Sequence, residues 1–287
     1  MGIGGIAKRY FKSGFFVLLT VAVFFIWYVV FVESRQKLTV AFLDVGQGDA
    51  ILIDTPGDQQ ILIDGGLNKQ VLAELSKVMP FYDRSIDVVI ATHPDQDHIS
   101  GLLDVLERYE VDFVVEPGVE SATAVYEGLE NLIGEKGIKK ILARRGMKLV
   151  LGENAYLLIL FPDRDVSGMD TNDASIVAKL VYGNTSFLFT GDSPKKIEEY
   201  LVFIDKENLD VDVLKAGHHG SKTSSSESFI GYTSPEYAII SAGENNRYGH
   251  PHKEVLDILE KFGAQILRTD ELETIIIESD GENIEIR

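Results

Sequence analysis

The chain has 287 residues and no cysteine, so disulfides and thiolate metal sites are excluded, and transition-metal ligands must be His, Asp or Glu. Hydrophobic residues make up 45% of the chain, which suits a large α/β core. The formal net charge of -18 argues against a broad electrostatic grip on nucleic acid, although bound divalent metals reverse the charge of a site locally.

An uncharged run of 19 residues, from Gly14 to Val32, stands apart at the N-terminus. A helix of that length rises about 28 Å, close to one bilayer core. Three basic residues precede the run, which predicts a cytoplasmic N-terminus. The residues before Ser34 offer no small-residue cleavage site, so an uncleaved anchor is favoured over a signal peptide.

These features predict three parts: a cytoplasmic segment at 1–13, a transmembrane helix at 14–32 and a domain at 38–287. The protein would be a single-pass protein of the cell membrane with its domain outside the cytoplasm. Residues 33–287 carry a formal charge of -21, because Lys8, Arg9 and Lys12 are the charged residues ahead of them.

Apolar runs of strand and helix character alternate along the domain. Expected strands lie at 38–43, 51–53, 61–63, 88–91, 111–115, 149–151, 155–161, 175–182, 187–189, 211–214, 265–268, 274–278 and 283–286. Expected helices lie at 67–79, 99–109, 122–136, 194–203 and 254–262. Periodicity alone therefore predicts a single mixed α/β domain.

Four metal-ligand residue types occur within six positions between the strand at 88–91 and the helix at 99–109. They are His93, Asp95, Asp97 and His98. Alternate residues of an extended turn point the same way and adjacent ones diverge, so the segment could hold two nearby cations. Asp97 could instead cap the helix, but a cap needs one such residue and not four.

Further polar residues follow two later strands. Asp192 lies between the strand at 187–189 and the helix at 194–203, where it could bind metal or cap the helix. His218 and His219 follow the strand at 211–214. Adjacent side chains diverge, so we favour His219 as a metal ligand and His218 as a phosphate or proton contact, with the reverse order open.

The loop after these histidines, Gly220-Ser221-Lys222-Thr223, offers amide and hydroxyl donors and a cation for an anionic oxygen. An ordinary polar loop is the alternative. Lys222 is therefore a candidate catalytic residue.

Six segments in this order resemble the metallo-β-lactamase superfamily, and in particular its ComEC/Rec2 branch of DNA-uptake proteins. They are residues 43–50, 62–66, 93–98, 172–175, 190–192 and 218–221. The resemblance covers residues 38–287 and implies an αββα sandwich with a binuclear metal site. It implies that His93 and Asp95 hold one metal, that Asp97, His98 and His219 hold the second, and that Asp192 bridges the two.

The chain departs from the family pattern at two positions. Asp95 stands where the family has a second histidine, and a carboxylate is a harder ligand that favours Mn²⁺, Mg²⁺ or Ca²⁺ over Zn²⁺. The family also has a histidine where this chain has Asn172-Asp173. Either Asp173 or the Asn172 carbonyl could take its place, or the segment could be an Asx turn.

The resemblance also places His250 near the mouth of the site, where it could protonate a leaving alkoxide or be an ordinary surface histidine. It places Asp49 and Asp64 beneath the metals as hydrogen-bonding supports.

Together these features predict a membrane-anchored hydrolase with two divalent metal ions, Zn²⁺ or Mn²⁺. The expected substrate is a phosphodiester, first of all extracellular DNA, with a separate channel protein as a possible partner. One alternative substrate is a cell-envelope phosphodiester or choline-type ester. Another interpretation is an anchored binding module without catalysis. The oligomeric state stays open.

Overall fold

A computed structural model describes residues 15–28 and 37–287. The chain divides into two units, residues 1–37 and residues 38–287, and each is described by itself. The expected cytoplasmic segment at 1–13 lies outside the described residues, as do both ends of the expected anchor.

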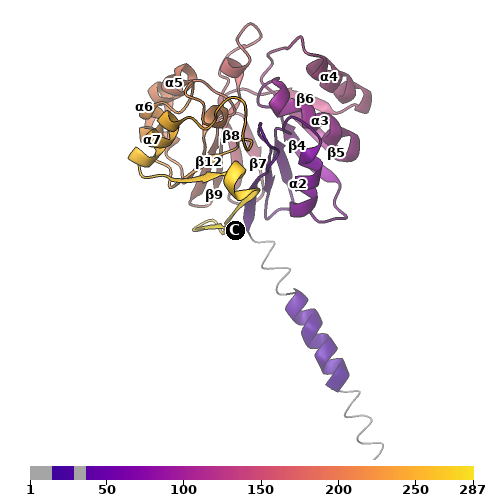
Figure 1. Ribbon diagram of the computed structural model, residues 1–287. Helices are drawn as coiled ribbons and strands as arrows, with labels where there is room; N and C mark the ends of the chain where they lie inside the picture. The colour runs from indigo at the N-terminus through magenta and orange to yellow at the C-terminus, as the bar shows by residue number, and fades with distance from the viewer. Residues whose placement is uncertain (1–14, 29–36) are drawn as a thin grey trace, which may run out of the picture. The chain divides into compact units, whose positions relative to one another are not determined.

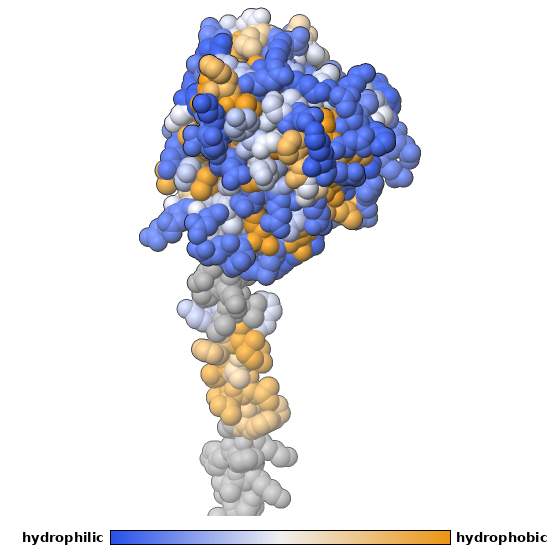
Figure 2. Space-filling model, turned by 90° about the vertical axis from the view of Figure 1, so that its left-hand side faces the viewer, coloured by the Kyte–Doolittle hydropathy of each residue, from blue (hydrophilic) through white to orange (hydrophobic). Residues whose placement is uncertain are grey.

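Residues 15–28 form a helix whose side chains are all exposed and mostly apolar (Figure 2). Within the described ranges, no helix combines the length and the apolar character needed to cross a membrane. This finding contradicts the predicted single-pass location in the cell membrane, and it gives the predicted transmembrane helix no support.

The domain contains two β-sheets. The first has eight strands in the order β15-β14-β1-β2-β3-β4-β5-β6. Its strands are β1 (Leu38–Phe42), β2 (Ile51–Asp54), β3 (Gln60–Ile63), β4 (Ser85–Ile90), β5 (Glu110–Glu116), β6 (Lys139–Leu142), β14 (Ile275–Ser279) and β15 (Ile284–Ile286). Strands β3 to β6 are parallel to one another, so their carboxyl ends lie at one edge.

The second sheet has seven strands in the order β13-β12-β11-β10-β9-β8-β7. Its strands are β7 (Lys148–Val150), β8 (Ala155–Phe161), β9 (Val177–Tyr182), β10 (Thr185–Phe189), β11 (Val213–Lys215), β12 (Tyr237–Ile240) and β13 (Gln265–Arg268). Strands β10 to β13 are parallel, so the loops that follow them also gather at one edge.

Helices cover the outer face of each sheet (Figure 1). The helices beside the first sheet are α2 (Gln70–Val78), α3 (Gln96–Arg108) and α4 (Ala124–Lys136). Those beside the second are α5 (Lys195–Asp205), α6 (Glu227–Thr233) and α7 (Lys253–Lys261), and a short α8 (Thr269–Leu272) follows β13. The face over α5 to α7 is mainly hydrophilic, with scattered apolar side chains (Figure 2).

The apolar core has three parts, as four layers require. One cluster lies between the sheets and contains inward-facing residues of both, such as Phe42 and Phe189, whose ring centroids are 6.3 Å apart. A second joins α5, α6 and α7 to their sheet, and a third joins α2, α3 and α4 to theirs. The predicted sandwich of two sheets with outer helices is therefore confirmed.

The expected elements agree with the observed ones to within a few residues. The hairpin of β2 and β3 forms as predicted, and Gly137 ends α4 in the left-handed conformation with φ of 65°. The sequence analysis did not predict β6, α6, β12 or the short α8. Strand β12 is a four-residue apolar run that carries no pattern of its own, and its neighbours β11 and β13 establish it by pairing.

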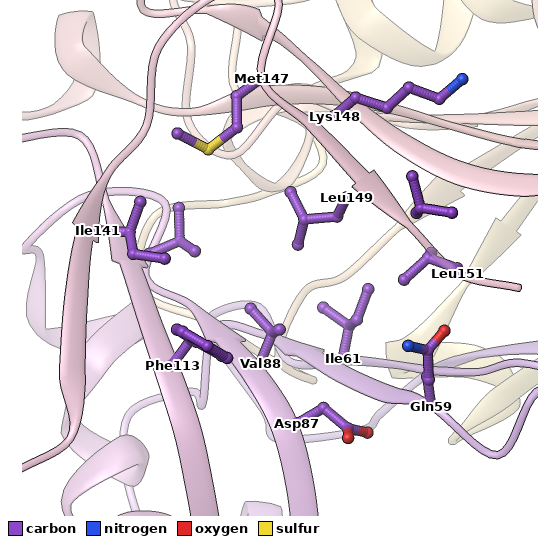
Figure 3. A pocket seen from close by; sticks show the side chains of 12 residues that line it. Gln59, Ile61, Asp87, Val88, Phe113, Ile141, Met147, Lys148, Leu149 and Leu151 are labelled. Carbon is purple, nitrogen blue, oxygen red and sulfur yellow. The ribbon is translucent and has the colours of Figure 1, made fainter.

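A pocket of about 400 Å³ opens between the two sheets (Figure 3). Its floor and roof are mainly apolar, with Ile61, Val88 and Phe113 from the first sheet facing Leu149 of β7. None of the candidate metal ligands lines this pocket. The candidate metal ligands lie elsewhere, at the loops that follow the parallel strands.

A buried glutamate fixes one of those loops. Glu198 of α5 accepts hydrogen bonds from the backbone N–H groups of Ser225 and Ser226, at 2.6 Å and 2.7 Å. The same serine segment is tied to the turn Gly217–Gly220, because the Ser224 hydroxyl donates to the Gly217 carbonyl oxygen at 2.6 Å. The position of the paired histidines in that turn therefore depends on the contact with α5.

The Glu198 contact predicts a pH-dependent stability. Burial raises the pKa of Glu198 to about 7, and the N–H donors of Ser226 and Ser225 limit the rise. Between the pKa of Glu198 in the unfolded chain and about 7, the folded chain binds a proton at Glu198 that the unfolded chain has released. The contribution of Glu198 to the free energy of unfolding therefore falls as pH rises through that window. The Glu198→Gln variant should lack that fall.

Denaturant midpoints at several pH values, compared between the parent chain and the variant, check this expectation. The difference between the two proteins cancels the pH dependence of every other group. Equal pH profiles would contradict it.

Candidate metal centre

The first ligand segment, Thr92–His98, follows the carboxyl end of the parallel strand β4 and includes the first turn of α3. Asp95 is the residue before the first turn of α3, and its side chain makes no capping hydrogen bond. The Asp97 carboxylate instead lies 3.5 Å from Nε2 of His219, which belongs to the other sheet's loops. The capping alternative for Asp97 therefore does not hold.

Asp192 lies at the centre of the cluster, in the loop between β10 and α5. Its Oδ1 is 3.3 Å from Nε2 of His98, and its Oδ2 is 3.8 Å from Nε2 of His93. Oδ2 is also 3.5 Å from Nε2 of His218 and 3.7 Å from Nε2 of His219. One carboxylate thus faces ring nitrogens from both motifs, which is the position that a bridging ligand requires.

The two adjacent histidines differ in their surroundings. His219 is buried, and its Nδ1 lies 3.0 Å from the carbonyl oxygen of Ser241. The His218 side chain is 26% exposed, and its Nδ1 lies 3.0 Å from the hydroxyl of Thr223. Both residues have positive φ, at 49° and 54°, so the turn directs both rings toward Asp192. This arrangement supports His219 as the ligand and His218 as the group at the mouth.

Buried groups behind the cluster fix the orientation of each ring. Asp64 accepts from Nδ1 of His98 at 2.7 Å and from the hydroxyl of Thr92 at 2.7 Å. Because that hydroxyl donates to Asp64, it accepts from Nδ1 of His93 at 3.0 Å. His93, His98 and His219 therefore all direct Nε2 toward the centre, the nitrogen that would bind a metal once the ring is neutral.

Asp49 supports His219 from the other side. It lies 3.2 Å from Nδ1 of His219 and accepts from Nζ of Lys215 at 2.7 Å. Lys215 and Asp49 are both buried, so the ion pair is largely shielded from water and the charge of each offsets that of the other. Asp49 and Asp64 thus occupy the supporting positions expected for them.

The glycine-bearing turn between β1 and β2 packs directly on the first motif. A Cβ atom at Gly48, whose φ is 124°, would lie 2.0 Å from the backbone oxygen of Asp97. No side chain fits at that distance. Gly48 therefore allows the close approach that fixes the backbone of the ligand segment.

Buried atoms without partners show that the cluster fits a metal. Among the described residues, Nε2 of His93, His98 and His219 and Oδ1 of Asp192 are buried and make no hydrogen bond. Leaving such polar atoms unsatisfied is costly unless another group binds them. Four groups of His and Asp atoms within 4.8 Å of one another could hold a metal among the described residues, and three of these groups contain His98. The four groups are His93–His98–Asp192, Asp97–His98–His219, Asp49–Asp64–His98 and Asp49–Asp192–His219.

The charges within the cluster are strongly coupled. Burial lowers the pKa of His219, but the Asp192 and Asp49 carboxylates outweigh it and raise that pKa to about 9. Burial and the neighbouring His98 lower the pKa of His93 to about 4. Without metal, the carboxylates therefore hold protons on some of the rings, and a bound cation would displace them.

The remaining predicted residues lie at different distances from this centre. Asp95 is 3.8 Å from Nε2 of His93, at the open side. The His250 ring lies 5.8 Å from His218 and 6.4 Å from His219, between centroids. Lys222 is exposed, and its backbone N–H donates to Nδ1 of His252 at 3.3 Å.

Asp173 is not brought into the cluster. Its carboxylate pairs with Lys196 of α5 and belongs to none of the groups that could hold a metal among the described residues. The Oδ1 atom of Asn172 is buried without a hydrogen-bond partner. These contacts disfavour Asp173 as the residue that takes the place of the missing histidine.

Sequence reasoning missed Lys215 and Ser241. Lys215 ends the apolar strand β11 and is fully buried, so an isolated charge in an apolar run was the available signal. Ser241 follows β12, and it was missed together with that strand. The backbone oxygen of Ser241 carries no sequence signal, because any residue offers one.

Residues 43–244 match the metallo-beta-lactamase superfamily, and the chain belongs to it. Its domain is of the ComEC/Rec2 type. It is 34% identical to ComE operon protein 3 of Bacillus subtilis over 253 residues, which cover 82% of this chain and 32% of that protein. It is 31% identical to competence protein ComA of Neisseria gonorrhoeae, over 83% of this chain and 31% of that protein.

The chain thus spans about a third of the length of the curated relatives it matches. Among solved structures, the fold resembles that of CmlA, a diiron beta-hydroxylase from Streptomyces venezuelae, with 16% identity and a TM-score of 0.54 over 80% of this chain and 52% of that one. It also resembles Igni18, a metallo hydrolase from Ignicoccus hospitalis, with 16% identity and a TM-score of 0.50 over 83% of this chain and 98% of that one. At these identities the likeness concerns the fold.

We predict that the Asp192→Asn variant loses at least one bound metal ion. An amide keeps the shape of the carboxylate but removes the negative charge and one oxygen lone-pair acceptor, so it cannot bridge two cations. Metal analysis of the purified full chain should approach two ions, with fewer in the variant. Asp173→Asn is the matched control and should keep the full metal content. Full metal content in Asp192→Asn would exclude the bridging role.

Proposed function

We propose that this protein is a metal-dependent phosphodiesterase that acts on DNA. The observation that supports it most is the set of buried, unpartnered Nε2 and Oδ1 atoms around Asp192, which a metal would satisfy. The superfamily indicates a metal-dependent hydrolase. The competence and recombination proteins among its relatives point to DNA as the substrate.

Divalent metal ions at these ligands would supply positive charge for the phosphate oxygens and lower the pKa of a water nucleophile. The chain's own residues supply the remaining chemistry. Asp64 and Asp49 hold the imidazoles in one orientation. His218, at the partly exposed mouth, is placed to hold or transfer a proton at Nε2.

The loop Gly220–Thr223 offers the groups that an anionic oxygen needs next to the centre. The Thr223 hydroxyl contacts His218, and the exposed Lys222 lies one residue before it. His250 lies beside His218 and can act on the leaving oxygen. These contacts support a role for the loop in binding a phosphate.

The substrate distinguishes the proposed function from other reactions of the superfamily. A carboxylate at Asp95 makes part of the site harder, which favours Mn²⁺ and anionic oxygen over Zn²⁺ and a neutral lactam carbonyl. The full chain with Mn²⁺ should therefore hydrolyse DNA or a simple phosphodiester and leave β-lactams intact. Efficient cleavage of a β-lactam, with every phosphodiester left uncut, would reject the proposed function.

We predict that Lys222→Ala lowers kcat/KM for a phosphodiester by roughly 10-fold, about the value of one charged hydrogen bond. Its metal content should not change, because the side chain is exposed and outside the ligand groups. Steady-state kinetics and metal analysis of the same preparation measure both. Lys136→Ala, an exposed lysine of α4, is the control and should behave like the parent chain. Unchanged kinetics in Lys222→Ala would remove this residue from the phosphate contact.

A further inference from the structure

The loop that leads into α7, residues 243–252, is held in shape by the amide of Asn246. Its Oδ1 accepts from the backbone N–H of Tyr248 at 3.2 Å and of His250 at 3.0 Å. Its Nδ2 donates to the carbonyl oxygens of Gly243 at 3.0 Å and His250 at 2.6 Å. One side chain therefore fixes both ends of the segment that carries Arg247 and Tyr248.

This segment places an exposed aromatic ring beside the metal centre. The Tyr248 ring stacks on His250, with centroids 5.6 Å apart and an interplanar angle of 20°. The His250 ring in turn lies 6.4 Å from His219. The His250 ring thus lies between Tyr248 and the candidate ligand His219, yet Tyr248 is 47% exposed.

A cation accompanies the ring. The guanidinium carbon of Arg247 lies 4.8 Å from the centroid of the Tyr248 ring, and Nη2 donates to the Tyr248 hydroxyl at 2.6 Å. The net charge of the domain is strongly negative. The segment 243–252 brings positive charge and an aromatic side chain to the mouth of the site.

Packing of the core does not explain this arrangement. A buried aromatic residue contributes to stability by removing apolar area from water, but Tyr248 remains exposed. Nucleic-acid-binding proteins use exposed rings of this kind, with a neighbouring cation, to stack on unpaired bases. The backbone of a strand whose phosphate lies at the metal centre would direct a neighbouring base toward such a ring.

We propose that Tyr248 and Arg247 form a stacking subsite for an unpaired nucleobase next to the phosphate that is cut, so that the preferred substrate is single-stranded nucleic acid. This inference rests on the proposed phosphodiesterase function and specifies its substrate. In the bound state Arg247 moves off the Tyr248 ring to contact the adjacent phosphate, Tyr248 stacks on the base, and Asn246 positions both.

The test compares two single-stranded oligonucleotides of equal length, one with bases and one in which abasic residues replace them. With the full chain and Mn²⁺, Tyr248→Ala should lower kcat/KM for the base-bearing strand by roughly 10-fold or more, the effect of losing one base–aromatic stack. Cleavage of the abasic strand should not change. Tyr248→Phe keeps the ring and should retain most of the preference.

Tyr232→Ala is the matched control, because Tyr232 is exposed to a similar degree, at 40%, and lies on α6. It should cut both strands like the parent chain. If Tyr248→Ala loses activity equally on both strands, the ring supports His250 structurally and the stacking subsite is rejected. Equal cleavage of both strands by the parent chain rejects it as well, while the proposed function stands.

Binding separates the two proposals if no cleavage occurs. Fluorescence anisotropy with Ca²⁺ in place of Mn²⁺ measures the affinity for each strand. Base-dependent binding that is lost in Tyr248→Ala would support the stacking subsite. The absence of cleavage would then reject only the proposed phosphodiesterase function. Absence of both cleavage and binding overturns both proposals.

Discussion

The Asp192 carboxylate, which faces four imidazole rings, is the interaction on which the rest of the site depends. The rings come from the loops after β4 and β11, which belong to different sheets. Parallel strands in each sheet direct their carboxyl ends to one edge, and face-to-face packing of the sheets brings the two edges together. The apolar cluster between the sheets therefore sets the distance between the two halves of the site.

A site of this kind concentrates unfavourable charge in a buried place. Two carboxylates, Asp49 and Asp64, lie directly behind the ligand rings, and both are buried. Asp49 is offset by the buried Lys215, and Asp64 by donors from Thr92 and His98. These contacts fix each imidazole so that Nε2 faces inward, and they leave the remaining negative charge for a cation to balance.

The negative net charge of the domain limits how a polyanionic substrate could be bound. A net charge of -21 over residues 33–287 disfavours a polyanionic substrate at long range. For the DNA substrate proposed above, local positive charge would come from bound metal and from a few cations at the mouth of the site, such as Lys222 and Arg247. Binding of such a substrate would depend more on short contacts at the site than on the long-range electrostatic field of the protein. Recognition would therefore rest on base stacking and on the metal centre.

The sequence by itself determined the elements with strong patterns and the residue types of the metal motifs. Alternation and capping marked most strands and helices, and four ligand types in six positions marked the first motif. The family resemblance already placed Asp97 with His219, and the two side chains meet across the two sheets. The pairing of Asp173 with Lys196, the ion pair of Lys215 with Asp49 and the role of the Ser241 carbonyl oxygen became visible only in the tertiary structure. Local patterns record propensity along the chain, whereas these contacts join residues far apart in sequence and arise from strand order and sheet packing.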